Sequence, residues 1–117
     1  GKDLFTVVKK PPERCKAGDV VLYRRPPDQY VLHRIVAVRE RDYVLLGDNC
    51  VSREYGIRDE DILGVMTGFV RNGKAHTVRE PLYRAYSAFM LHGAPLRVAV
   101  KRLELGARGL ARRLLRR

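Results

Sequence analysis

One histidine stands in the middle of an apolar segment and is the first candidate for acid–base chemistry. His33 belongs to the run YVLHRIV at residues 30–36. An imidazole titrates near neutral pH and can accept a proton from a hydroxyl group. Side chains alternate between the faces of a strand, so we expect His33 to project to the same side as Val31, Ile35 and Ala37. Taken alone, a histidine in this setting is more often a half-buried structural residue.

The segment Gly47-Asp48-Asn49 is the second candidate, and it follows the apolar run at residues 43–46. A carboxylate at the end of a strand can orient an imidazole through its other ring nitrogen. The same residue types are also common in ordinary turns. His33 and Asp48 therefore indicate a site only in combination with other features.

Four segments in this order resemble the LexA-repressor and type I signal peptidase superfamily of serine endopeptidases. They are GDVVLYRR from residue 18, YVLHRIVAV from residue 30, YVLLGDN from residue 43 and ILGVMTGFV from residue 62. Within that superfamily the chain is similar to the histidine-type signal peptidases and to small clostridial signal-peptidase-like proteins. The resemblance covers residues 1–78.

The resemblance implies a Ser-His mechanism. In that family a serine from an S-M-x-P motif attacks the peptide carbonyl, and by this match His33 is the base that takes its proton. Asp48 falls on the aspartate of the family's G-D-N box, and Glu54 stands where a further acidic residue follows. The implied substrate is a leader or signal segment bound as an extended strand, with no metal and no cofactor.

The nucleophile is the largest departure from the family pattern. The chain has two serines, Ser52 and Ser87, and neither lies in S-M-x-P. The chain begins at Gly1 instead of Met, directly before the strand-like LFTVV segment, so we expect the serine to precede Gly1. A shortened N-terminus is favoured over a true pseudoenzyme, and the chain as written should not hydrolyse peptides.

The elements that must position these residues are short strands, which predicts a mainly β domain over residues 1–79. The resemblance implies that this domain has a signal-peptidase-like fold. Apolar, β-branched runs separated by turn residues predict strands at 4–8, 20–23, 30–38, 43–46, 62–70 and 75–78. The Asn72-Gly73 pair predicts a type I′ hairpin between the last two strands.

Residues 80–117 have helical spacing and form a predicted basic tail. We expect a first helix to pack on the β-domain through Leu82, Tyr86 and Phe89, and a second to begin near Pro95. The second helix is predicted to carry an apolar side with positive charge elsewhere. That side consists of Leu96, Val100, Leu103, Leu110 and Leu114.

The net charge of +11 points to an anionic partner. The tail holds nine basic and two acidic residues, namely Arg84, Arg97, Lys101, Arg102, Arg108, Arg112, Arg113, Arg116 and Arg117 against Glu80 and Glu104. An amphipathic helix on anionic lipid fits this pattern. Nucleic acid ranks below it, because no aromatic stacking platform or recognition motif accompanies the charge.

Length and composition limit the remaining possibilities. A chain of 117 residues fits one small domain, and its apolar runs are far shorter than the roughly 20 residues of a membrane-spanning helix. Cys15 and Cys50 can form one disulfide or none. We expect a cytoplasmic or membrane-peripheral protein. Two other functions remain open, a non-catalytic domain that binds peptide or an anionic surface and a basic β-barrel that binds nucleic acid.

Overall fold

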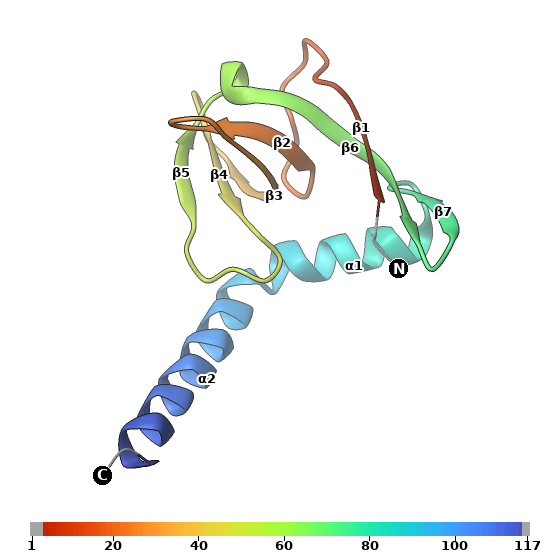
Figure 1. The fold of residues 1–117 in the computed structure, drawn as a ribbon. Coiled ribbons are helices and arrows are strands. Elements are labelled where there is room, and N and C mark those ends of the chain that lie inside the picture. The colour runs from red at the N-terminus through yellow and green to blue at the C-terminus, as the bar shows by residue number, and fades with distance from the viewer. Residues whose placement is uncertain (1–3, 116–117) are drawn as a thin grey trace.

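The computed structural model describes the backbone of residues 4–115 and the side chains of residues 4–109. In this part of the chain seven strands form one antiparallel sheet, followed by two helices (Figure 1). The expectation of a mainly β fold is confirmed. The strands are β1 (Leu4–Lys9), β2 (Val20–Arg25), β3 (Gln29–Val38), β4 (Tyr43–Leu46), β5 (Glu54–Ile57), β6 (Ile62–Arg71) and β7 (Lys74–Thr77).

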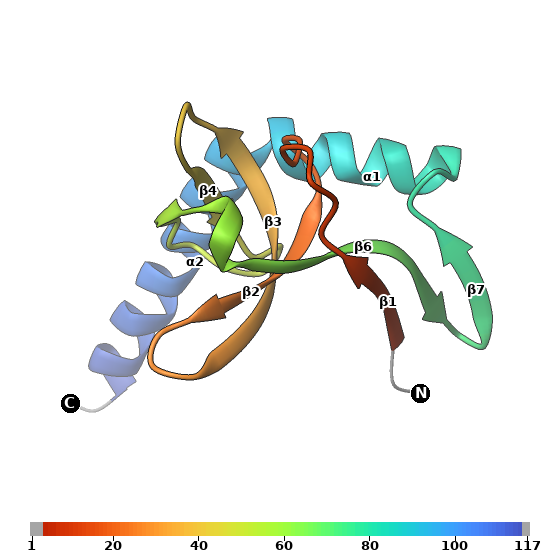
Figure 2. The same ribbon diagram turned by 90° about the horizontal axis from the view of Figure 1, so that it is seen from above.

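The sheet is curled, and its strand order is β1-β6-β2-β3-β4-β5, with β7 paired to β6 (Figure 2). We call its concave side the core face, because β2, β3 and β4 bury their largest apolar side chains there. Cys15 from the β1–β2 loop and Ile62 complete this cluster. Its members on β2, β3 and β4 are Val21, Tyr23, Ile35, Tyr43 and Leu45.

The opposite side, which we call the helix face, carries Arg34 and its cross-strand partner Leu46. Helix α1 (Pro81–His92) runs along this face, and α2 (Ala94–Leu115) begins after Gly93. Ala94 and Val98 in the first turns of α2 pack with Leu46. Beyond them α2 projects away from the sheet (Figures 1 and 2). None of the helices described is long and apolar enough to cross a membrane.

The predicted hairpin at residues 71–74 is confirmed. Arg71 pairs with Lys74, and Asn72 and Gly73 have φ angles of 52° and 76°. Positive φ at both central positions is the signature of a type I′ turn, whose twist matches that of the strands it joins. Strand β4 also has its predicted bounds, whereas β5 and the short 3₁₀ helix at Asp59–Asp61 were not predicted.

Two expectations about the faces of these elements are wrong. Ala37 does not share a face with His33, because the register between β3 and β4 shifts between Ile35 and Ala37 and breaks the alternation. Leu82 and Phe89 do not pack on the sheet, since 88% and 66% of their surfaces are exposed.

Both cysteines are free thiols, so the disulfide left open by the sequence does not form in this structure. Cys15 is buried in the core-face cluster, and Cys50 packs against the cluster around Leu46. The two thiols therefore lie in separate apolar clusters.

The buried phenol of Tyr43 ties the β1–β2 loop to the segment after β5. Its hydroxyl accepts hydrogen bonds from the Cys15 backbone N–H at 3.0 Å and from Arg14 Nε at 3.1 Å. It donates one to the Asp59 carboxylate, which also forms an ion pair with Lys10. This hydroxyl connects segments that are not neighbours in the sheet.

Tyr43→Phe should therefore destabilise the fold by about 1–3 kcal/mol, because it leaves the buried Cys15 N–H without an acceptor. Urea denaturation followed by circular dichroism measures the change. Tyr30→Phe is the matched control, since Tyr30 is 63% exposed and should unfold like the unmodified protein. Equal midpoints for the two variants would show that the phenol hydroxyl is not a structural link.

Candidate functional site

His33 lies on the core face of β3, opposite Val21 of β2, and is half-buried at the margin of the apolar cluster. Its Nδ1 is 2.8 Å from the backbone oxygen of Leu32. A carbonyl oxygen can only accept a hydrogen bond, so this contact assigns the proton of the neutral imidazole to Nδ1. Nε2 then carries the lone pair, which is the form required of a general base.

The loop after β4 approaches the imidazole closely at Gly47. A Cβ atom at this position would lie 2.8 Å from His33 Cε1 and 2.7 Å from Cys50 Sγ. Real Cβ atoms do not make such short contacts with either group. A larger residue at position 47 would therefore force the His33 and Cys50 side chains to shift.

Asp48 binds the neighbouring residue of β3 instead of His33. The Arg34 guanidinium, only 2% exposed, donates from Nε and Nη2 to the two Asp48 carboxylate oxygens at 3.0 Å each. Its Nη1 donates to Gly18 O at 2.8 Å and to Ser87 Oγ at 2.7 Å. A buried charge needs this degree of pairing, and bidentate geometry supplies it.

The helices also hold the Asp48 loop. The Tyr86 hydroxyl donates to Asp48 Oδ2 at 2.8 Å, and Arg97 Nη1 donates to the Asp48 backbone oxygen at 2.8 Å. Burial raises the pKa of the Asp48 carboxyl, but the ion pair with Arg34 and the hydrogen bond from Tyr86 outweigh it, so the net pKa is lowered. Asp48 is therefore an ionised anchor for α1 and α2.

His33 and Arg34 are successive residues of one strand, so their side chains point to opposite faces of the sheet. The imidazole is on the core face, whereas the Asp48 carboxylate lies against Arg34 on the helix face. The structure thus brings Gly47 to His33 but gives the carboxylate of Asp48 other partners. The atom that orients the imidazole here is the Leu32 oxygen.

Glu54, the third predicted site residue, begins β5 opposite Leu45 and so belongs to the core face, as His33 does. Its carboxylate forms an ion pair with Arg25. Burial raises the pKa of this carboxyl despite the arginine. Glu54 is therefore the acidic candidate that shares the face of His33.

Neither serine offers a free nucleophile beside the imidazole. Ser87 is on α1, where its hydroxyl accepts from Arg34 and donates to Gly18 O at 3.3 Å. Ser52 lies exposed on the loop between β4 and β5. The serine hydroxyls of this chain therefore have a structural role or face solvent.

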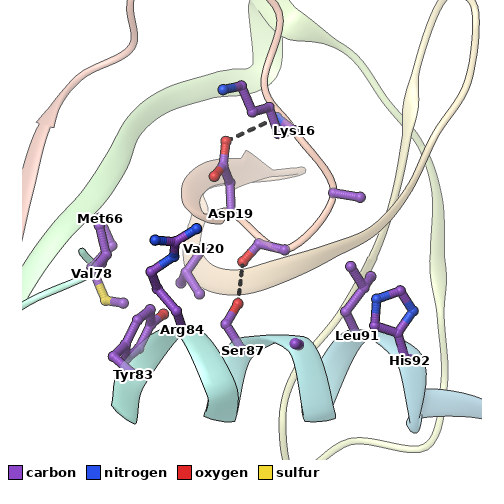
Figure 3. A pocket seen from close by; sticks show the side chains of 13 residues that line it. Lys16, Asp19, Val20, Met66, Val78, Tyr83, Arg84, Ser87, Leu91 and His92 are labelled. Carbon is purple, nitrogen blue, oxygen red and sulfur yellow. Dashed lines mark hydrogen bonds between the residues drawn. The ribbon is translucent and has the colours of Figure 1, made fainter. Parts of the chain in front are cut away.

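Two hollows lie along the helices, and His33 lines neither. One of about 370 Å³ separates α1 from the loop before β2, and Tyr83, Arg84, Ser87 and Leu91 of α1 line it (Figure 3). The other, of about 420 Å³, lies where the Asp48 loop meets the junction of α1 and α2. Among the described residues, no group of three or more histidine, cysteine and acidic side chains is placed where it could hold a metal ion.

Arg34, Tyr86 and Ser87 are the site residues that the sequence-based prediction did not single out. An arginine inside an otherwise apolar strand was the available signal, because a charge in such a place must find a buried partner. Tyr86 and Ser87 carried no comparable signal. Their roles follow from the position of α1.

Scans against models of protein families, and searches among curated proteins and solved structures, find no significant match to this chain. The signal-peptidase-like resemblance therefore rests on the sequence segments alone.

Asp48→Asn should destabilise the protein by about 3 kcal/mol at neutral pH, because it leaves the buried Arg34 charge without its counter-ion. The folded pKa of Asp48 lies below its unfolded value of about 3.9. Its contribution is therefore complete above that value and is lost as the pH falls through the lowered folded pKa. The difference between variant and unmodified protein should shrink in acid.

Urea denaturation at several pH values measures this difference. Asp28→Asn is the matched control, because its ion pair with Arg24 is exposed and contributes at most about 1 kcal/mol. A stability gap for Asp48→Asn that stays constant into acid would contradict the assignment.

Proposed function

We propose that residues 1–79 form a signal-peptidase-like serine endopeptidase domain in which His33 is the general base. The observation that carries the proposal is the imidazole itself. Its Nδ1 is committed to the Leu32 carbonyl, its ring is half-exposed, and the Gly-Asp-Asn loop contacts it at Gly47. This leaves Nε2 as a proton acceptor on a residue whose orientation is set by backbone atoms.

The reaction requires a serine hydroxyl within about 2.6–3.2 Å of Nε2. Ser52 and Ser87 do not supply it, so the proposal assigns this hydroxyl to a segment that precedes β1. As the serine oxygen bonds to the peptide carbonyl, its proton passes to Nε2. The imidazolium then gives that proton to the departing amine, and a water molecule hydrolyses the acyl ester with the imidazole again acting as base.

The proposed substrate is a leader or signal segment in extended conformation. Strands β1 and β5 stand at the two ends of the strand order, so each has an edge that pairs with no other described strand. An added strand can bind such an edge through its backbone and place alternate side chains on one face. Exposed Leu4 and Phe5 make the β1 edge a suitable apolar surface for such a segment.

A non-catalytic peptide-binding domain is the second candidate. The observation that favours it is the engagement of Ser87 with Arg34 and Gly18, which removes one of the two serine hydroxyls of the chain from catalysis. Such a domain would keep the sheet edges for binding and would need no nucleophile.

The deciding experiment uses the protein encoded by the complete reading frame, incubated with a library of signal-like peptides and analysed by mass spectrometry. We expect cleavage at defined positions, and His33→Ala should lower its rate by about 10²–10⁴-fold, the usual effect of removing a general base. The chain of residues 1–117 should be inactive in the same assay.

His92→Ala is the matched control, because His92 is an exposed residue at the end of α1 and should leave cleavage unchanged. Cleavage that survives His33→Ala would refute the proposed mechanism. Binding of the peptides by the complete protein without any cleavage would establish the non-catalytic candidate instead.

A further inference from the structure

Helix α2 has two apolar faces, and the sheet covers only one of them. Ala94 and Val98 are 2% and 5% exposed and pack with Leu46. Leu96, Val100 and Leu103 follow the i, i+4, i+7 spacing of a second face, and they are 71%, 55% and 74% exposed. The sequence continues this spacing at Leu110 and Leu114, whose side chains lie outside the described part.

The second face continues onto α1. Leu82 and Phe89 lie on the side of α1 that faces away from the sheet and are exposed. Phe89 lines the same hollow as Leu96 and Val100. We call Leu82, Phe89, Leu96, Val100 and Leu103 the exposed strip. It crosses the bend between the two helices, so the apolar surface is shared by both helices.

The surroundings of the strip are strongly basic. Residues 80–117 contain nine basic and two acidic side chains. Glu104, one of the two acids, is paired with Arg108 at 2.6 Å. An apolar strip on a segment of high net positive charge matches the two parts of an anionic bilayer surface, its acyl boundary and its headgroups.

We propose that the exposed strip docks α1 and α2 onto an anionic lipid bilayer, with the helices lying in the interface. This does not depend on the peptidase proposal. A second copy of the chain fits the strip less well, because pairing two copies through it would bring two basic segments together. A nucleic acid would use the charge but would leave the large apolar side chains exposed to water.

Docking would also fix the position of the His33 region relative to the bilayer. Two guanidinium groups of α2 hold the loop after β4, Arg97 through the Asp48 backbone oxygen at 2.8 Å and Arg102 through the Val51 oxygen at 3.4 Å. The Asp48 loop lines the same hollow as part of the exposed strip. The Gly-Asp-Asn loop is thus held beside the helices that would lie on the lipid.

The test is co-sedimentation of the chain with vesicles of phosphatidylcholine alone or mixed with phosphatidylglycerol, at low and moderate salt. We expect binding to the anionic vesicles that falls with salt but persists through the apolar strip. The double variant Leu96→Gln with Leu103→Gln should reduce the partition coefficient by about tenfold or more, since burial of apolar groups contributes strongly to interfacial binding. Both positions are exposed, so circular dichroism should be unchanged.

Leu4→Gln with Leu63→Gln is the matched control, because it replaces two exposed leucines of the sheet, 63% and 45% exposed. It should bind vesicles like the unmodified chain. Equal losses in the two double variants would overturn the proposal, as would equal binding to neutral and anionic vesicles. Tighter retention on RNA than on anionic vesicles would also overturn it. So would a dimer that the Leu96/Leu103 variant dissociates without change in vesicle binding.

Discussion

The arrangement of the helices on the sheet depends on the buried guanidinium of Arg34. A charge that is 2% exposed must be paired and hydrogen-bonded, since an unpaired one costs several kcal/mol. Its partners come from three segments: Gly18 before β2, Asp48 after β4 and Ser87 on α1. All three must be in place together, so this one side chain sets where α1 lies. Replacing both members of such a pair by apolar residues is often neutral for stability, whereas removing one member is strongly destabilising.

Local chemistry explains which parts of the fold could be predicted. The Asn72-Gly73 turn and strand β4 carry their signals within a few residues, and both occur as expected. Strand β5 was missed because its sequence, EYGI, contains no run of β-branched residues and includes Gly56 with a φ of 76°. The spacing of α1 was correct, but its packing face was not. Arg34 requires polar partners, so Ser87 faces the sheet while Leu82 and Phe89 face away.

For the candidate site too, the sequence indicated the residues but not their arrangement in the fold. The resemblance placed His33, Asp48 and Glu54 in one group, and spacing along the chain did not reveal how they divide between the two faces. The alternation of β3 puts the imidazole on the core face, while Asp48 pairs with Arg34 on the other. What Asp48 does for His33 is therefore indirect: it holds the loop whose Gly47 leaves room for the imidazole. Glu54 shares the face of His33 through the pairing of β4 with β5.

The adjacent pair His33-Arg34 also selects how β2 and β3 align. In the observed pairing Val20 stands opposite Arg34 and Val21 opposite His33. A slip of one residue exchanges the faces of every side chain on the strand. It would carry the guanidinium among Tyr23, Tyr43 and Leu45, away from Asp48, at a cost of several kcal/mol. An apolar residue at position 34 would remove most of that penalty. The buried arginine therefore restricts β3 to the observed alignment with β2. The Val, Leu and Ile residues of the strand alone would tolerate both this alignment and the one shifted by one residue.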